Sequence, residues 1–211
     1  MEHSASIDGR EVRRWCREGM YCEVEDRIKS GNPVPTGGPK ERSPLVLASE
    51  NGFHSLVKLL LGHAVWPQRC LDAALARSAA GGHYEVTKLL LESGASVSDV
   101  VAKDLVVCGN PEVVYLLVAK GVDIETHNPL ADAIGYEEPH ALALLKRGQR
   151  RLPTIRKQGA LALTLSVAHE YENRAERLYR AGCDHRLEVP IPCTYPYARS
   201  GETSPSSAMW E

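Results

Sequence analysis

Cys183, Asp184 and His185 stand next to one another in this 211-residue sequence. A thiol beside an imidazole can act as a nucleophile, because the base accepts the thiol proton and leaves a reactive thiolate. Glu137 and Glu138 form a carboxylate pair, but adjacent side chains on a helix or turn point apart, which favours two solvated groups. No H-E-x-x-H, G-x-S-x-G or G-x-x-x-x-G-K-S/T pattern is present. These motifs mark the common hydrolase and nucleotide sites, so no catalytic residue and no cofactor is predicted.

A metal site is not predicted either. The eight histidines are dispersed, and no two cysteines form a C-x-x-C pair. Structural zinc needs such closely spaced ligands. We therefore expect reduced thiols at all six cysteines, which are Cys16, Cys22, Cys70, Cys108, Cys183 and Cys193.

The segment "KRGQRRLPTIRK", residues 146–157, has more weight as a contact site. It holds six cations and no acid. Such a cluster can neutralise phosphates or face an acidic protein patch, and an ordinary charged loop is the alternative interpretation. No aromatic residue is interleaved, so base stacking is not supported. We define the basic segment by its cations: Lys146, Arg147, Arg150, Arg151, Arg156 and Lys157.

Composition limits the classes of protein that fit. The net charge is −2 and aromatic residues make up 6% of the chain, while 43% is hydrophobic. This balance does not favour nucleic-acid or anionic-membrane binding by the chain as a whole. No apolar run approaches the length of a membrane span, and the first residues lack the pattern of a secretion signal. A cytoplasmic location is therefore expected.

One pattern recurs along the chain. "SPLVLASENGFHSLVKLLLGHAV" (43–65), "GGHYEVTKLLLESGASV" (81–97) and "GNPEVVYLLVAKGVDI" (109–124) each contain a glycine followed by apolar residues at helical spacing. A short segment rich in small or apolar residues precedes the glycine in each case. The repetition predicts pairs of antiparallel helices with a turn at the glycine.

These units resemble ankyrin repeats, whose pattern is T-P-L-H-x-A, a glycine-led turn and a V-V-x-L-L-L helix. The turn glycines Gly19, Gly52, Gly82 and Gly109 are separated by 33, 30 and 27 residues, against a usual period of about 33. The resemblance implies an all-α ankyrin-repeat solenoid of stacked helical hairpins, with β-hairpin fingers shortened after the second and third units. The C-terminal part is also loosely similar to bacterial ankyrin proteins of unassigned role.

The predicted domain organisation follows from the repeat pattern. Residues 1–6 form an N-terminal arm, and residues 189–211, rich in Pro, Ser and Thr, form an extended or disordered tail. Between them, residues 7–188 form the repeat domain. Its expected units are 7–33, 34–66, 67–97, 98–125, 126–151 and 152–188.

The resemblance also implies a function, which is non-catalytic protein–protein interaction in a subunit, adaptor or inhibitor of a larger bacterial assembly. It places Cys183 and Asp184 in a tight loop after Gly182, which argues against catalysis there. Two interpretations of Trp66 stay open, an interface anchor or a cover for the shortened loop. The alternative function is a nucleic-acid-associated accessory protein acting through the basic segment. No membrane partner and no small-molecule substrate are expected.

The resemblance also implies where a partner binds. In ankyrin repeats, partners contact the finger tips and the exposed residues before the turn glycine. Here these residues are Arg17, Glu18, Arg42, Glu50, Asn51, Trp66, Arg69, Asp72, His127, Tyr136 and His169.

Overall fold

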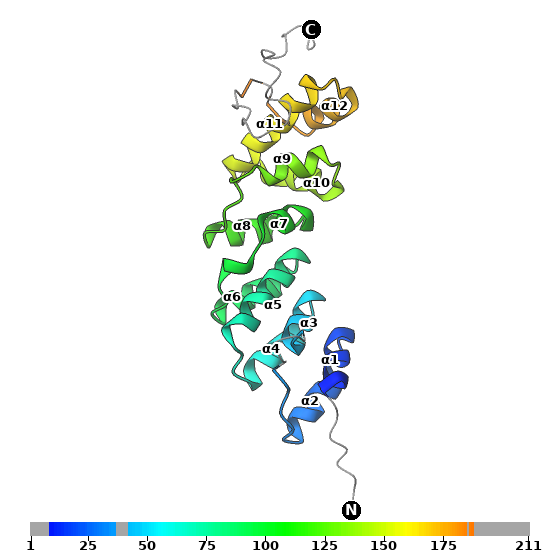
Figure 1. The fold of residues 1–211 in the computed structure, drawn as a ribbon, viewed down its shortest axis with the longest axis vertical. Helices are drawn as coiled ribbons and strands as arrows, with labels where there is room; N and C mark the ends of the chain where they lie inside the picture. Colours follow the sequence, from blue (N-terminus) through cyan, green and yellow to red (C-terminus); the bar gives the residue numbers. More distant parts are fainter. Residues whose placement is uncertain (1–8, 37–41, 185, 188–211) are drawn as a thin grey trace, which may run out of the picture. The chain divides into compact units, whose positions relative to one another are not determined.

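The computed structural model of the chain describes residues 9–36, 42–184 and 186–187. Within those residues it is built of helices and contains no strand, so the all-α prediction is confirmed (Figure 1). Connections expected as β-hairpin fingers contain no strand wherever the structure describes them, and one of them includes a 3₁₀ turn. The arm 1–6, the tail 189–211 and residues 37–41 of the long finger lie outside the described residues.

The described helices follow one another in pairs along the chain (Figure 1). The chain divides into two compact units, Met1–Val122 and Asp123–Glu211, which we call the N-terminal unit and the C-terminal unit. The N-terminal unit contains α1 Gly9–Glu18, α2 Tyr21–Lys29, α3 Pro44–Glu50, α4 His54–His63, α5 Gln68–Ala80, α6 Tyr84–Glu92, a 3₁₀ turn η1 Val97–Asp99, α7 Ala102–Cys108 and α8 Pro111–Ala119. The C-terminal unit contains α9 Pro129–Gly135, α10 Pro139–Gly148, α11 Pro153–Ala168 and α12 Glu172–Arg180.

Short polar side chains and prolines start several of these helices. The Ser43 hydroxyl oxygen accepts a 3.3 Å hydrogen bond from the Val46 amide, and Pro44 is the first residue of α3. Asn110 caps α8 in the same way, accepting a 3.1 Å bond from the Glu112 amide. A capping side chain satisfies an amide that has no partner inside the helix, and proline at the first position loses no hydrogen bond.

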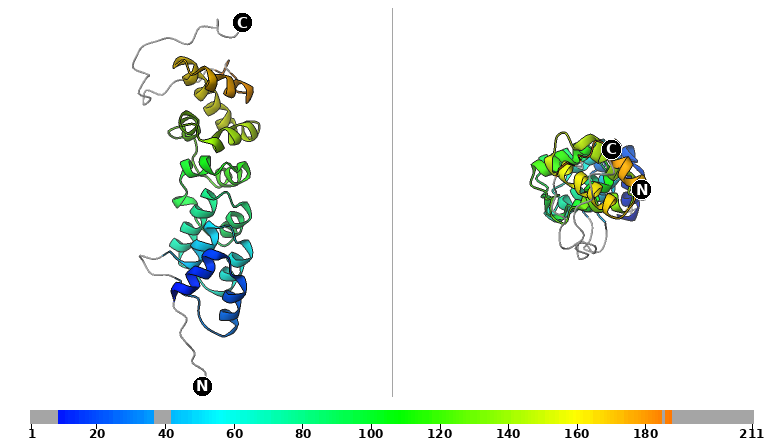
Figure 2. Two further views of the ribbon diagram at one scale, coloured as in Figure 1. Left: turned by 90° about the vertical axis from the view of Figure 1, so that its right-hand side faces the viewer. Right: turned by 90° about the horizontal axis from the view of Figure 1, so that it is seen from above.

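In the N-terminal unit the first helices of successive pairs pack on one another, and so do the second helices. α3, α5 and α7 therefore lie on one side of α4, α6 and α8 (Figures 1 and 2). Leu60 of α4, Leu90 of α6 and Leu117 of α8 are fully buried between the layers. Full burial of such a side chain contributes about 1.5–3 kcal/mol relative to exposure, so the helices are stable as a stack and not singly.

The turns between paired helices depend on left-handed backbone. Gly19, Gly52 and Gly82 have φ of 75°, 74° and 71°, and Gly109 has φ of 65°. Glycine adopts these angles without strain because it has no Cβ. The four turn glycines identified in the sequence are therefore at the turns, as predicted.

In the C-terminal unit, the amide side chains of buried Gln158 and half-buried Gln149 connect the loops. Gln158 of α11 is 3% exposed, accepts a 2.8 Å bond from the Leu130 amide and donates a 2.6 Å bond to the carbonyl of Ile124. Gln149 donates a 2.7 Å bond to the carbonyl oxygen of Ala181. These bonds fix the start of α9 and the end of α12 against other parts of the unit.

Candidate functional site

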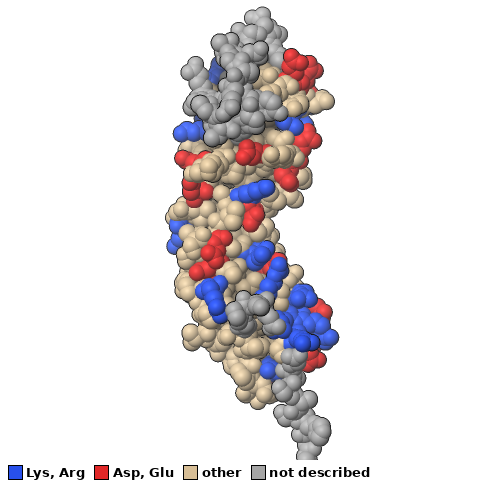
Figure 3. All heavy atoms as spheres, in the orientation of Figure 1, with Lys and Arg blue, Asp and Glu red and all other residues tan. Residues whose placement is uncertain are grey.

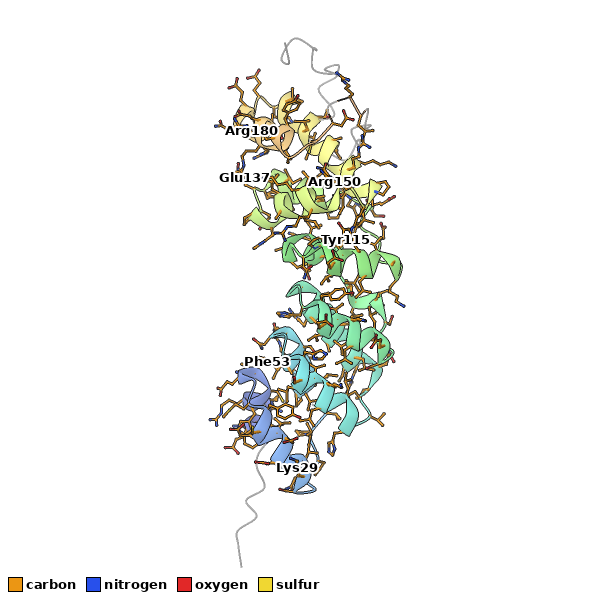
Figure 4. The ribbon with its side chains drawn as sticks, turned by 180° about the vertical axis from the view of Figure 1, so that it is seen from behind. Lys29, Phe53, Tyr115, Glu137, Arg150 and Arg180 are labelled. Atoms are coloured by element: carbon orange, nitrogen blue, oxygen red, sulfur yellow. The ribbon has the colours of Figure 1, made fainter. Side chains whose placement is uncertain are left out.

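The turns of the N-terminal unit are stacked by side chains that lie over the turn glycines. The Phe53 ring, at the junction of the first two helix pairs (Figure 4), is so close to Gly19 that an added Cβ would lie 2.8 Å from it. The His83 ring lies against Gly52, where the corresponding distance is 2.5 Å. His83 Nε2 is also 3.0 Å from the carbonyl oxygen of Glu50. Each glycine thus leaves room for a side chain of the next turn.

A third contact has the same geometry. Asn110 donates a 2.7 Å hydrogen bond to the carbonyl oxygen of Gly82, and an added Cβ on Gly82 would be 3.3 Å from the Asn110 Cβ. Phe53, His83 and Asn110 each stand directly after the turn glycine of their own pair. The position after the turn glycine therefore fixes the spacing between consecutive turns.

A row of accessible polar groups lies at the turns after the first helices and at the starts of α3 and α5, and we call it the ridge. It consists of the predicted contact residues of this unit that remain accessible: Arg17, Glu18, Arg42, Glu50, Asn51 and Arg69. Arg42 and Glu50 form an ion pair at 2.7 Å, with side chains 54% and 33% exposed. Asn51 donates a 2.9 Å bond to the carbonyl of Leu47 and so ends α3. Arg69 is exposed at the start of α5.

Two predicted contact residues of this unit are not accessible. Trp66 is 6% exposed, and its Nε1 donates a 2.9 Å bond to the carbonyl of Leu60. Covering the shortened loop is therefore the interpretation that the structure supports, and the interface-anchor interpretation is corrected. Asp72 is 8% exposed, and its carboxylate accepts a 2.6 Å bond from the Ser96 amide and a 2.8 Å bond from Gln68. It secures the following loop, because a buried carboxylate must be hydrogen-bonded.

Three arginines of α1, Arg10, Arg13 and Arg14, are absent from the predicted set. Arg10 and Arg14 are exposed and Arg13 is half-buried. Their spacing of three and four residues, shared with Arg17, places them along one face of the helix. That spacing is visible in the sequence, so periodicity of charge would have identified them.

The C-terminal unit carries the other predicted contact residues. His127 is exposed in the loop before α9. Tyr136, which is 82% exposed, and His169 directly precede Glu137 and Glu170 at the turns after α9 and α11. The His169 ring lies 6.0 Å from that of Tyr171. Tyr136 and His169 therefore occupy equivalent places in the two helix pairs of this unit.

The six cations of the basic segment are all exposed. They lie in the last turn of α10, in the connection and in the first turn of α11, with Arg150 in the connection (Figure 4). Arg156 forms a 3.1 Å ion pair with Asp184. Lys146 and Arg147 interact favourably with the negative end of the α10 dipole, whereas Arg156 and Lys157 oppose the dipole at the start of α11.

A hollow in the C-terminal unit has both signs of charge. Ile134, Leu142 and Leu178 form its apolar lining, and Glu137, Glu138, Arg174 and Arg177 line it with charged groups. Arg174 is bonded to Glu137 at 3.4 Å and lies 4.6 Å from the centre of the Tyr171 ring. The four charges balance one another, which gives the hollow no preference for an ion.

The thiol chemistry considered from the sequence is not supported. Burial raises the pKa of Cys183 from its ordinary 9.0 to about 11, and that of Cys16 to about 12. Both thiols are therefore protonated at neutral pH, whereas a nucleophilic cysteine needs a lowered pKa. Asp184 is paired with Arg156, and His185 lies outside the described residues. The residues that the structure describes contain no cluster of metal-ligating side chains.

Comparisons with known proteins agree with this geometry. Residues 16–104 match a family model described as ankyrin repeats in three copies. The crystal structure of the human ASB11 ankyrin repeat domain is similar, with a TM-score of 0.58 and 19% identity over 83% of this chain and 85% of that one. No curated protein sequence matches this chain. Among the described residues, no helix is long and apolar enough to cross a membrane.

Proposed function

Because this chain is an ankyrin-repeat protein, we propose that it is a non-catalytic protein-binding module that acts through the ridge. Ankyrin repeats are in general protein–protein interaction modules. The observation that carries the proposal is the row of accessible polar groups at the starts and ends of successive first helices. Such a module would serve as a subunit, adaptor or inhibitor within a larger assembly.

The rigidity of the ridge supports this function. Phe53, His83 and Asn110 fix consecutive turns by direct contact, so the exposed groups are already ordered before a partner arrives. Binding to a preorganised surface costs less conformational entropy than binding to a mobile one. A repeat array presents an extended surface, which suits a protein partner better than a small substrate.

The charges of the ridge favour a protein over a phosphate backbone. Arg17, Arg42 and Arg69 are interspersed with Glu18 and Glu50. An interface of mixed sign selects a partner with the complementary pattern. A phosphate chain would meet repulsion at each carboxylate, because its charge has one sign throughout.

The C-terminal unit would contribute in a different way. The basic segment has one sign of charge and is exposed, so it would steer an acidic partner and raise the association rate more than the residence time. Tyr136 is 82% exposed. Large amphipathic side chains of this type often contribute strongly to protein interfaces. His127 and His169 complete the proposed contact set of this unit.

The proposal is tested by affinity capture with two matched double variants. The immobilised full chain is exposed to a lysate of the cells that make it, and retained proteins are identified by mass spectrometry. Arg42→Glu/Asn51→Asp should lose the specific partner, whereas Arg150→Glu/Arg151→Glu should retain it. A partner kept by the first variant and lost by the second would place the main contact on the basic segment. Retention of nucleic acid alone, removed by moderate salt, would favour the accessory-protein alternative.

A further inference from the structure

α1 concentrates arginine on one face. Four of its ten residues are Arg10, Arg13, Arg14 and Arg17. Arg13 and Arg14 each lie three or four residues from both Arg10 and Arg17, so the four side chains share one face of the helix. Val12 and Cys16, which are fully buried, lie on a different face. We call these four residues the arginine stripe, and Figure 3 shows the Lys and Arg side chains gathered over α1.

The arginine stripe is unfavourable for α1 itself. Like charges three or four residues apart destabilise a helix, and the four arginines form four such pairs. Arg10 is in the first turn, where a cation opposes the helix dipole. Within the part of the chain that the structure describes, neither Arg14 nor Arg17 forms an ion pair. The guanidinium groups of Arg14 and Arg17 are therefore available to a partner.

Neighbouring helices extend the positive charge on the same side of the unit. α1 packs on α3, and α3 packs on α5. α5 contributes Arg69 and Arg77, both exposed, to the row of first helices. First helices also expose acidic residues, which are Glu11 and Glu18 on α1 and Asp104 on α7. The concentration of positive charge is therefore a property of α1, to which α5 adds two exposed arginines.

We propose that the arginine stripe binds an acidic segment of a partner protein, with Asp or Glu side chains repeated at helical spacing. Arg10 and Arg17 are seven residues apart, which corresponds to about 10 Å along the axis. An acidic helix with carboxylates at positions i, i+4 and i+7 covers the same length. Arginine pairs with carboxylates through two parallel hydrogen bonds, which gives this match directional specificity.

Nucleic acid fits the arginine stripe less well. Glu11 and Glu18 flank it on the same helix, and each would repel a continuous phosphate chain. Single-stranded nucleic acid also binds on aromatic platforms. The strongly exposed aromatic residues of the described chain, Tyr136, Tyr171 and Tyr179, all belong to the C-terminal unit. An acidic protein segment is therefore the favoured occupant.

This inference rests on the proposed function, because it names the chemistry of the partner that a protein-binding module would take. The two can fail separately. The capture experiment changes Arg42 and Asn51, whereas the test below changes Arg14 and Arg17. Capture of a partner that lacks an acidic segment would retain the proposed function and overturn the inference.

The test uses the full chain and a labelled 16-residue helical peptide with Glu at positions i, i+4 and i+7, beside the same peptide with Gln at those positions. Fluorescence anisotropy measures both affinities at low and moderate salt. We expect the Glu peptide to bind, the Gln peptide to bind at least tenfold more weakly, and the affinity to fall as salt rises. Single-stranded and duplex DNA are titrated in parallel.

Matched variants assign the site. Arg14→Gln/Arg17→Gln should weaken binding of the Glu peptide about tenfold or more, and Arg14→Lys/Arg17→Lys should retain part of the affinity because the charge is kept. Lys58→Gln/Lys88→Gln, which removes two exposed cations from second helices α4 and α6, should leave it nearly unchanged. Thermal unfolding should show Arg14→Gln/Arg17→Gln to be at least as stable as the parent, since repulsion within α1 is reduced.

Three results would overturn the inference. Equal affinity for the Glu and Gln peptides would remove the electrostatic basis. An unchanged affinity in Arg14→Gln/Arg17→Gln, with binding lost in the Lys58→Gln/Lys88→Gln control, would place the contact elsewhere. Tighter binding of DNA than of the Glu peptide, with a steeper dependence on salt, would make nucleic acid the occupant.

Discussion

The N-terminal and C-terminal units make the same turn between paired helices with different residues. In the N-terminal unit, glycine takes the left-handed conformation at each turn after a first helix. In the C-terminal unit the equivalent residues are Glu137 and Glu170, with φ of 61° and 57°. Left-handed backbone costs a residue with a Cβ about 1–2 kcal/mol. The two units thus reach one geometry at different energetic cost.

The absent Cβ has a second consequence. Gly52 leaves space that the His83 ring occupies, and the ring then reaches the carbonyl of Glu50 at 3.0 Å. At Glu137 a side chain occupies that region, and Arg174 from the next pair meets it as a 3.4 Å ion pair. The turn at Gly52 is therefore held by packing of the His83 ring, whereas the turn at Glu137 is held by an ion pair at the surface.

The replacement does not restore the lost stability. The Arg174 and Glu137 side chains are 21% and 65% exposed, and an ion pair that is exposed in this way contributes about 0–1 kcal/mol. This is less than the backbone cost at a single left-handed glutamate. We therefore expect the turns of the C-terminal unit to open more readily than those of the N-terminal unit.

The largest expected effect is in thiol reactivity, because the described part of each unit contains one buried cysteine. Burial raises the pKa of Cys16 to about 12 and that of Cys183 to about 11. Exposed Cys22 should react with iodoacetamide at pH 7.5 at least roughly a hundredfold faster than either, since the thiolate is the reactive form. Peptide mass spectrometry of a labelling time course measures the three rates.

The two buried thiols also compare the units directly. If the turns of the C-terminal unit open more readily, Cys183 should react faster than Cys16 under native conditions. Equal rates for both cysteines would contradict the proposed difference in local stability. A rate at Cys183 above that of Cys22 would instead revive the nucleophile hypothesis.

The second effect is the loss of stability in Gly52→Ala. The substitution introduces a Cβ at φ of 74° and 2.5 Å from the His83 ring. Left-handed strain together with overpacking should lower the free energy of unfolding by at least about 2 kcal/mol. Urea denaturation followed by circular dichroism measures the change.

Two other glycines separate strain from contact. Gly94 has φ of 89° with open space around its Cβ position, so Gly94→Ala should lose only the strain, about 1–2 kcal/mol. Gly62 lies inside α4 with nothing within 4 Å, and Gly62→Ala should stabilise the chain by about 0.5–1 kcal/mol. Equal losses at Gly52 and Gly94 would show that the His83 contact contributes nothing.

The third effect concerns partner binding. Arg42→Glu/Asn51→Asp, on the ridge, should weaken binding of the captured partner by more than tenfold, or about 1.4 kcal/mol. Arg150→Glu/Arg151→Glu, on the basic segment, should mainly reduce the salt dependence of the association rate. Surface plasmon resonance at several salt concentrations separates the two outcomes. If Arg150→Glu/Arg151→Glu abolished binding and Arg42→Glu/Asn51→Asp left the affinity unchanged, the main contact would be the basic segment and not the ridge.

The smallest expected effect is that of Glu137→Gly. The change relieves the left-handed strain of about 1–2 kcal/mol. Against this, glycine raises the conformational entropy of the unfolded chain, which costs about 0.5–1 kcal/mol of stability, and the ion pair with Arg174 is lost. The free energy of unfolding should therefore change by less than about 1 kcal/mol. A loss above about 2 kcal/mol would show that Glu137 has a structural role beyond the turn.

The sequence by itself determined the features that depend on neighbouring residues. Helical spacing of apolar residues and the turn glycines are local signals, and each is present in the structure. The repetition of these signals also determined the all-α repeat fold.

Only the tertiary structure decided which polar and aromatic side chains are accessible. Trp66 and Asp72 occupy places where the repeat pattern predicts contact with a partner, yet both side chains are buried. Trp66 is hydrogen-bonded to Leu60, and Asp72 is hydrogen-bonded to Gln68 and Ser96. Whether a side chain faces solvent depends on the length of the adjoining loop and on residues far away in the chain. The bonds of Gln158 to Ile124 and Leu130, 34 and 28 residues away, have the same origin, because long-range contacts form only when the helices pack.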